Sequence, residues 1–361
     1  MKIGLRLPNF ARWFRGDAIW ATCEKGKEID LDALSFVDHV IFTPQQYVGY
    51  GNGYMDIWTA MAYVAAVTNV QGWKPILSQS VCVIPYRPPI QQAKVAATVD
   101  SLSGGRLLIG VGSGYNENEY AALGLNVRER GAMTHEYLAC MKELWTHPVA
   151  SFHGKYANFD EMTISVRPTQ QPHPPILFGS SGPVPFRRIA ERYQGWLRGT
   201  VNVNDANDDY FRGLEHDWAT INALWKEHGR QGKPYLMVQM GGHLTADSAE
   251  AGQSVVKGLA TEGQSIVGTA GRVEAGGERA YVTAFPKTLV SDTVKQLRRY
   301  EAMGVDLVLI NVPSYRFGTL DNLGTQLQQM DLLAEHVLPK ISREKKKPEF
   351  DFDGKVLSPM G

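Results

Sequence analysis

The sequence predicts a (β/α)8 TIM barrel with insertions. Short apolar runs alternate with longer amphipathic segments along most of the 361 residues, which is typical of parallel strands joined by crossover helices. The alternation gives eight candidate strands, and eight strand-helix units favour closure into a barrel. A glycine-rich segment at 104–114 adds a tight helix stop, a short apolar strand and a bare strand exit, as an αβ connection of this fold requires.

The elements follow in order along the chain. We expect strands at 2–7, 33–37, 76–83, 106–111, 175–179, 195–198, 234–240 and 306–311, because these are the short apolar runs bounded by turn signals. We expect helices at 17–28, 56–68, 89–102, 131–146, 183–193, 206–228, 290–303 and 319–338, where apolar residues recur with the helical period.

A doubly wound open sheet is the competing architecture. It usually carries a phosphate-binding glycine loop after its first strand, whereas here Pro8, Asn9 and Phe10 follow that strand. The glycines at 110 and 112 do not complete a dinucleotide fingerprint either, because Tyr115 stands where the third glycine would fall. The barrel is therefore favoured over the open sheet.

One large domain accounts for most of the chain. We expect residues 1–341 to form a single barrel domain and 342–361 a C-terminal tail, since barrels with insertions commonly reach this length. Two segments fall outside the repeat. Residues 150–166 are expected to form an inserted hairpin, and 241–286, rich in Gly, Ala, Ser and Thr, is either a mobile lid or a disordered surface insertion.

Composition limits the classes of partner and the cellular compartment that we expect. The 37 basic and 37 acidic residues leave no net charge, so nucleic acid and membrane surfaces are not expected as partners. The three cysteines, Cys23, Cys82 and Cys140, lack a C-x-x-C spacing and suit reduced thiols. The first residues do not resemble a secretory signal, and the sequence contains no run of about 20 apolar residues. We expect a soluble, cytoplasmic protein.

Candidate catalytic residues follow the second strand. In a (β/α)8 barrel the active site lies at the carboxyl ends of the strands, and there Asp38 and His39 stand side by side. A histidine next to a carboxylate can act as acid, base or hydrogen-bond donor near neutral pH. The alternative is that His39 is a structural imidazole and Asp38 caps the loop. Placement at the catalytic face favours the functional interpretation.

Small polar residues mark two further strand exits. Ser80 interrupts an apolar strand and either faces a ligand or is tolerated inside the barrel. Ser180 and Ser181 precede a helix that starts near Pro183, so hydroxyl groups and helix N-terminal amides could bind a phosphate there; a plain N-cap explains them equally well.

The nine histidines show no paired metal-binding spacing, and we expect no metal site.

These blocks, taken in order, resemble the bacterial luciferase-like flavin monooxygenases and the related coenzyme F-420-dependent oxidoreductases. The resemblance implies a TIM barrel, often dimeric, that binds a reduced flavin or deazaflavin at the carboxyl ends of the strands. It also strengthens the phosphate interpretation at 180–182. It rests on 3–5, Asp38-His39, Thr98 to Arg106, Arg167 to Ile176 and Gly304 to Val308.

The resemblance also implies roles for individual residues. His39 matches the catalytic histidine of the family and Asp38 its neighbour. The segment matching Ser80-Val81 forms a bulge in relatives, often with a non-proline cis peptide, that supports the central flavin ring. Tyr115 departs from the sugar-phosphate dehydrogenase branch, which has an acidic proton donor there, and this argues against that reaction. The implied cofactor-binding residues are Ser80, Val81, Gly112, Ser113, Gly114, Tyr115, Gly179, Ser180, Ser181 and Gly182.

Three functions are compatible with these residues. The leading hypothesis is a homodimeric monooxygenase that takes reduced FMN from a separate flavin reductase and uses dioxygen to oxygenate an organic, apolar or aromatic substrate. The second is hydride transfer between coenzyme F-420 and an organic substrate, with Arg187, Arg188 and Arg192 as candidates to bind the acidic cofactor tail. The third is a non-catalytic flavin-binding subunit, against which the presence of His39 argues.

Overall fold

The computed structural model describes residues 1–7, 9, 15–44, 54–252, 271–275, 278–282, 287–311, 323–345 and 350–352. Its centre is a parallel sheet in the order β3-β2-β1-β15-β10-β9-β8-β5-β4, and β3 also pairs with β5, which closes the ring. The predicted barrel is thereby confirmed. The strands are β1 (Lys2–Arg6), β2 (Ala33–Phe36), β3 (Ile76–Gln79), β4 (Cys82–Val83), β5 (Leu107–Gly112), β8 (Ile176–Phe178), β9 (Gly195–Asn202), β10 (Tyr235–Gly241) and β15 (Leu307–Asn311).

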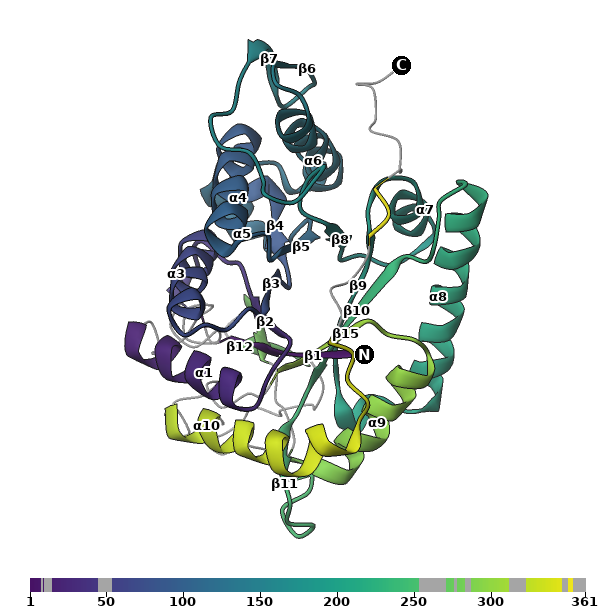
Figure 1. The fold of residues 1–361 in the computed structure, drawn as a ribbon. Coiled ribbons are helices and arrows are strands. Elements are labelled where there is room, and N and C mark those ends of the chain that lie inside the picture. The colour runs from purple at the N-terminus through teal and green to yellow at the C-terminus, as the bar shows by residue number, and fades with distance from the viewer. Residues whose placement is uncertain are drawn as a thin grey trace.

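Helices surround this ring on its outer side (Figure 1). Among them α4 ends at Gly104, which adopts the left-handed conformation with φ 72° and so makes the helix stop that the sequence predicts. The helices are α1 (Gly16–Glu28), α3 (Ile57–Val70), α4 (Pro89–Ser103), α5 (Glu117–Ala122), α6 (Arg130–Thr146), α7 (Pro183–Arg192), α8 (Asp208–Glu227), α9 (Val290–Ala302) and α10 (Leu323–Leu332), followed by a π-helical turn at Leu333–Val337.

One predicted strand, 76–83, is wrong as a continuous element. It is divided into β3 and β4 by Ser80 and Val81, whose peptide bond is cis. The Ser80 amide donates to the Phe36 carbonyl at 2.8 Å, and the Val83 amide donates to the Asp38 carboxylate at 3.0 Å. The Asp38 side chain thus accepts the Val83 amide, while β4 still pairs in parallel with β5 through Val83 and Gly112.

Smaller elements flank the barrel. Strands β6 (Ala150–His153) and β7 (Asn158–Met162) pair antiparallel within 150–166. After β10, strand β11 (His243–Thr245) pairs in parallel with β14 (Lys287–Leu289), and β12 (Gly271–Ala275) pairs antiparallel with β13 (Glu278–Val282). The other residues of 253–286, on which the lid and disorder interpretations of 241–286 depend, lie outside the described residues.

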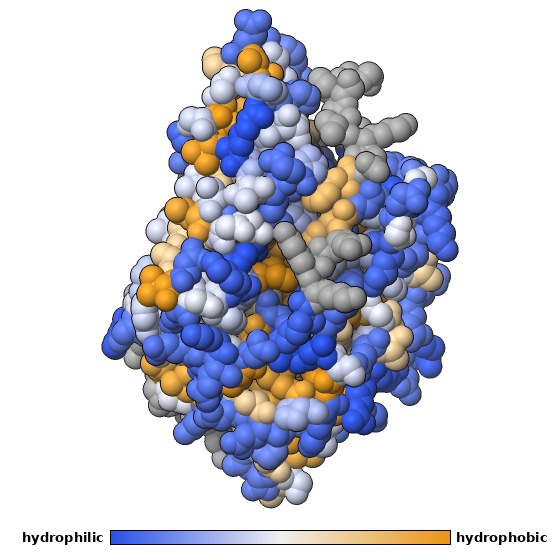
Figure 2. Space-filling model, in the orientation of Figure 1, coloured by the Kyte–Doolittle hydropathy of each residue, from blue (hydrophilic) through white to orange (hydrophobic). Residues whose placement is uncertain are grey.

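The apolar core has two layers. The larger layer packs the outer faces of the strands against the helices, and the smaller one fills the barrel interior. Hydrophilic residues cover most of the face seen in Figure 2, and apolar residues form smaller patches on it. The inner layer consists of Ala33, Leu108, Leu177, Leu197, Tyr235, Met237, Leu307 and Leu309.

Part of the C-terminal tail packs against the barrel. The Phe350 ring lies 5.1 Å from the ring of Tyr235, centroid to centroid, and contacts the inner apolar layer. Asp351 forms an ion pair with Arg230, whose side chain is only 2% exposed. Because Tyr235 begins β10, the tail covers the amino-terminal end of the barrel, opposite the expected active site.

Candidate active site

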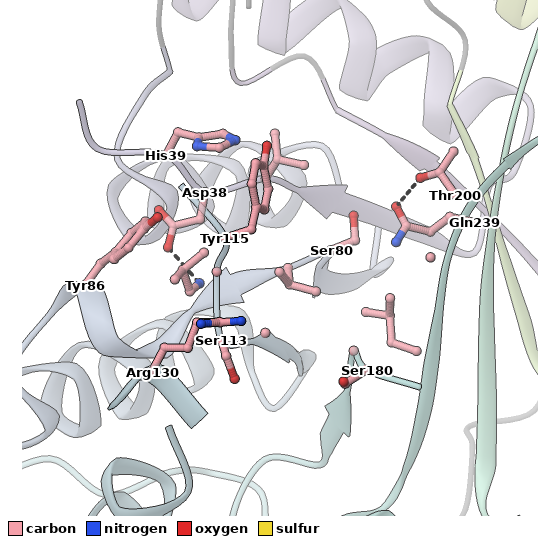
Figure 3. A pocket seen from close by; sticks show the side chains of 18 of the residues that line it. Asp38, His39, Ser80, Tyr86, Ser113, Tyr115, Arg130, Ser180, Thr200 and Gln239 are labelled. Carbon is pink, nitrogen blue, oxygen red and sulfur yellow. Dashed lines mark hydrogen bonds between the residues drawn. The ribbon is translucent and has the colours of Figure 1, made fainter. Parts of the chain in front are cut away.

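A cavity of about 760 Å³ opens where the barrel strands end. Its walls come from residues at the carboxyl ends of β1, β2, β3, β5, β8, β9 and β10, the face on which barrel enzymes carry their active sites. Figure 3 shows His39, Ser80, Ser113 and Ser180 around this one space. The sequence-predicted residues that line it are Asp38, His39, Ser80, Val81, Gly112, Ser113, Gly114, Tyr115, Gly179 and Ser180.

Ser181 and Gly182 are not among the lining residues. Gly182 is the N-cap of α7, with φ 113°, and Ser181 is exposed. The Ser180 carbonyl accepts a hydrogen bond from the Trp196 indole at 2.9 Å, which fixes the backbone just before the helix. Gly179 and Ser180 are therefore the part of this predicted phosphate site that faces the cavity.

His39 is held by a carboxylate, but that carboxylate is not Asp38. The His39 Nδ1 atom lies 2.8 Å from Glu119 Oε2, and the Glu119 side chain is fully buried. Glu119 also accepts hydrogen bonds from the Tyr86 hydroxyl at 3.0 Å and from the Val40 amide at 2.7 Å. Glu119 lies on α5, a short helix that the sequence analysis did not predict.

Asp38 makes a different set of contacts. Its two carboxylate oxygens accept a forked pair of hydrogen bonds from Arg87, at 2.8 and 2.9 Å, and one oxygen also accepts the Val83 amide. The Asp38 side chain is fully buried. Such a bidentate pair has a defined geometry, and it joins the exit of β2 to the exit of β4.

Aromatic rings surround His39. Its ring centroid lies 4.9 Å from that of Tyr54, 5.0 Å from that of Phe42 and 6.1 Å from that of Tyr115. Tyr115 is 52% exposed and lines the cavity together with Tyr54. The histidine therefore lies beside an apolar, aromatic part of the cavity wall.

Val81 forms part of the cavity wall and packs against two bare glycines. A Cβ atom on Gly112 would lie 2.6 Å from Val81 Cγ2, and one on Gly179 would lie 3.0 Å from Val81 Cγ1. Next to it, the Ser80 hydroxyl accepts a hydrogen bond from Ser35 at 2.8 Å. Glycine at both positions lets the backbone approach Val81 closely, and all three residues line the cavity.

Cationic side chains that sequence reasoning missed also line the cavity. Arg6 ends β1, and Arg128 and Arg130 lie at the junction between α5 and α6. Arg130 points toward Ser113 in Figure 3. The arginines named from sequence, Arg187, Arg188 and Arg192, are not among the lining residues. Nothing in the sequence around 128–130 signalled a binding role, because the segment lies between predicted elements.

Two further findings concern the described part of the chain alone. His, Cys, Asp and Glu side chains do not gather there in a group of three or more that could hold a metal ion. Among its helices, none combines the length and the apolar composition needed to cross a membrane.

Together, the closed barrel and its cavity at the strand exits define a TIM barrel with a site for a small-molecule ligand. The family model described as luciferase-like monooxygenase matches residues 38–307. The chain belongs to this family.

Several curated relatives match parts of the chain. An uncharacterized protein of Mycobacterium tuberculosis, Rv0953c, is 30% identical over 51% of this chain and 60% of its own length. The FMNH(2)-dependent dimethylsulfone monooxygenase of Pseudomonas putida is 33% identical over 41% of this chain and 40% of its own. The pyrimidine monooxygenase RutA of Allorhizobium ampelinum is 30% identical over 52% and 49%. The chain thus spans 60% or less of the length of each of these relatives.

Solved structures share the whole fold at low identity. Monooxygenase RslO1 from Streptomyces bottropensis superposes with a TM-score of 0.69 and 18% identity, covering 94% of this chain and 99% of its own. An F420-dependent secondary alcohol dehydrogenase, in complex with an F420-acetone adduct, has a TM-score of 0.65 and 18% identity, with the same coverage. At this identity the likeness concerns the fold alone.

Proposed function

We propose that the protein is an oxidoreductase that binds reduced FMN in the cavity and oxygenates an organic, apolar or aromatic substrate with dioxygen. The observation that carries the proposal is the cavity itself, which is lined by a histidine, by Val81 with its neighbouring glycines, and by the cationic side chains of Arg128 and Arg130. Its volume lies within the range of about 300–1,000 Å³ that small-molecule sites occupy. The name of the dimethylsulfone monooxygenase, an FMNH(2)-dependent relative, agrees with this choice of cofactor.

The lining residues fit a flat, phosphorylated cofactor. The bare glycines let Val81 pack closely against them, and Val81, which lines the cavity, would present its side chain to a planar ring. Arg128, Arg130 and Ser180 line the same cavity and would hold a phosphate through charge-assisted hydrogen bonds. When bound, reduced FMN would supply the electrons that activate dioxygen, a chemistry that belongs to the cofactor.

The protein's own residues would orient the substrate and manage protons. Tyr54 and Tyr115 line the cavity beside His39 and would seat an apolar or aromatic substrate there while excluding water. His39 would hold or move a proton next to that substrate. Asp38, tied to Arg87, would brace the loop that carries His39. We further propose that a separate reductase supplies the reduced FMN and that the active form is a homodimer.

Reduced coenzyme F-420 is the competing cofactor, since a cationic cavity side suits its acidic tail as well as a phosphate. Anaerobic fluorescence titration with each reduced cofactor separates the two. Micromolar binding of reduced FMN, with weaker binding of reduced F-420, supports the proposal. Preferential binding of F-420 would replace it with hydride transfer, and binding of neither would remove the proposed function altogether.

His39 provides the second test. We expect His39→Ala to lower turnover about a hundredfold or more, the usual contribution of general acid-base catalysis, while affinity for the reduced cofactor changes little. The matched control is His153→Ala, which removes an exposed histidine on β6. Near-normal turnover of the His39 variant would exclude the histidine from the mechanism.

A further inference from the structure

The carboxylate that holds His39 is placed as a dedicated partner for its imidazole. Glu119 is fully buried and lies 80 residues from His39 in the chain. Its Oε1 atom accepts the Val40 amide at 2.7 Å, and its Oε2 atom contacts both the His39 Nδ1 atom and the Tyr86 hydroxyl. Two separate segments of the chain, at 39–40 and at Tyr86, thus converge on one side chain.

The protonation of this group follows from its partners. Burial alone would raise the pKa of Glu119, but the hydrogen bond and the positive charge of His39, together with the hydrogen bonds from Val40 and Tyr86, outweigh burial and hold the pKa below its ordinary value. Burial, together with the charge of Glu119, raises the pKa of Tyr86, so the phenol keeps its proton. The Val40 amide and the Tyr86 hydroxyl also donate to the two Glu119 oxygens whatever the tautomer of His39. This arrangement favours the carboxylate, which only accepts hydrogen bonds.

A carboxylate at this position requires a proton on the facing nitrogen. The His39 Nδ1 atom must carry the hydrogen that bridges the 2.8 Å separation from Glu119, because the tautomer of a histidine is set by the hydrogen bond that one of its nitrogens makes. The other nearby carboxylate, Asp38, is already engaged by Arg87 and Val83. In the neutral ring the lone pair is therefore on Nε2.

We propose that Glu119 is a positioning residue that fixes His39 as the Nδ1–H tautomer, so that neutral His39 accepts a proton at Nε2 and does not donate one from it. This rests on the proposed function, in which His39 handles a proton beside the substrate. On proton transfer the proton leaves the reacting group for Nε2, and the charge of the resulting imidazolium is balanced by the Glu119 carboxylate. An acidic residue that orients a catalytic histidine in the same way occurs in serine hydrolases.

Glu119→Gln makes the inference testable because the neighbours dictate how the new amide must point. The Val40 backbone amide can only donate, so it selects the amide oxygen of the glutamine. The Tyr86 hydroxyl, which donates to Oε2 of Glu119, can rotate and accept instead. The NH₂ group then takes the place of Oε2, where it donates to the His39 Nδ1 atom. The ring can accept that bond only with its proton on Nε2, and the substitution is expected to reverse the tautomer.

The measurement is a long-range ¹⁵N–¹H correlation spectrum of the histidine rings, recorded on the full chain without cofactor at a pH where the rings are neutral. The His39 signals are identified by their loss in His39→Gln. We expect the Nδ1–H pattern in the wild type and in Glu117→Gln, which alters an exposed carboxylate on the same helix, and the Nε2–H pattern in Glu119→Gln.

An Nε2–H pattern in the wild type, or an unchanged pattern in Glu119→Gln, would overturn the proposal. If Glu119→Gln does not fold, Tyr86→Phe keeps the carboxylate and is expected to keep the Nδ1–H pattern, while the wild-type spectrum still decides the assignment. None of these spectra depends on turnover or on a bound cofactor, so a failure of the proposed function remains distinguishable from a failure of this inference.

Discussion

Replacing Gly112 by alanine tests whether the cavity wall at Val81 depends on a bare backbone. The added Cβ atom would lie 2.6 Å from Val81 Cγ2, whereas carbon atoms pack at about 3.5–4.0 Å. Val81 would have to move by about 1 Å, and a β-branched side chain has little rotamer freedom with which to yield. Overpacking of this kind costs about 1–3 kcal/mol of stability.

The same displacement should weaken cofactor binding. A shift of about 1 Å in a group that positions a reactant can cost about a hundredfold in activity, and we expect the dissociation constant of reduced FMN to rise at least about tenfold, or 1.4 kcal/mol. Urea denaturation measures the stability, and anaerobic fluorescence titration measures the affinity. Gly213→Ala is the matched control, because a Cβ there meets no atom within 4 Å.

A double variant shows whether the clash is the cause. Val81→Ala removes both Cγ atoms, so Gly112→Ala combined with Val81→Ala should be more stable than the sum of the two single effects by about 1 kcal/mol, as expected for residues in contact. A Gly112→Ala protein with the wild-type urea midpoint and affinity would refute this reasoning. Additive single effects would place the cause elsewhere.

Two further predictions concern stability. Asp351→Ala removes the carboxylate that pairs with Arg230, whose side chain is 2% exposed, and should lower the free energy of unfolding by about 3–5 kcal/mol, as measured by chemical denaturation. Asp209→Ala, which breaks an exposed ion pair, should change it little. Equal effects of the two substitutions would contradict the role of the tail. Burial lowers the pKa of His173 to about 3, so between pH 6.5 and 3 the unfolded chain binds a proton that the folded one does not, and stability falls as the pH falls. The His173→Gln protein should show a shallower fall across that window, and an unchanged slope would contradict the assignment.

The barrel could be predicted from the sequence because its strands and helices are short, regular and local. The break at Ser80-Val81 could not be predicted from composition or periodicity, since the side chain that accepts the Val83 amide after the break is that of Asp38, 45 residues away in the chain. Only the family resemblance indicated a bulge there. The contact of the tail with Arg230 spans 121 residues and leaves no local pattern.

The residues of the candidate site that lie at the strand exits could be predicted from the sequence, but their charged partners could not. Asn116 and Glu119 have the spacing of a helix N-terminus, and Asn116 does cap α5; that signal could have located the helix. It could not have shown that Glu119 turns toward His39, because this depends on how two distant strand exits meet. Arg128 and Arg130 were missed for the same reason.

The central claim is that the cavity at the strand exits binds reduced FMN, and a crystal structure of the protein with FMN tests it most directly. We expect the flavin ring to lie against Val81 and Gly112, with the phosphate facing Arg128, Arg130 and Ser180. A flavin bound elsewhere on the barrel, or a phosphate directed away from those side chains, would contradict it.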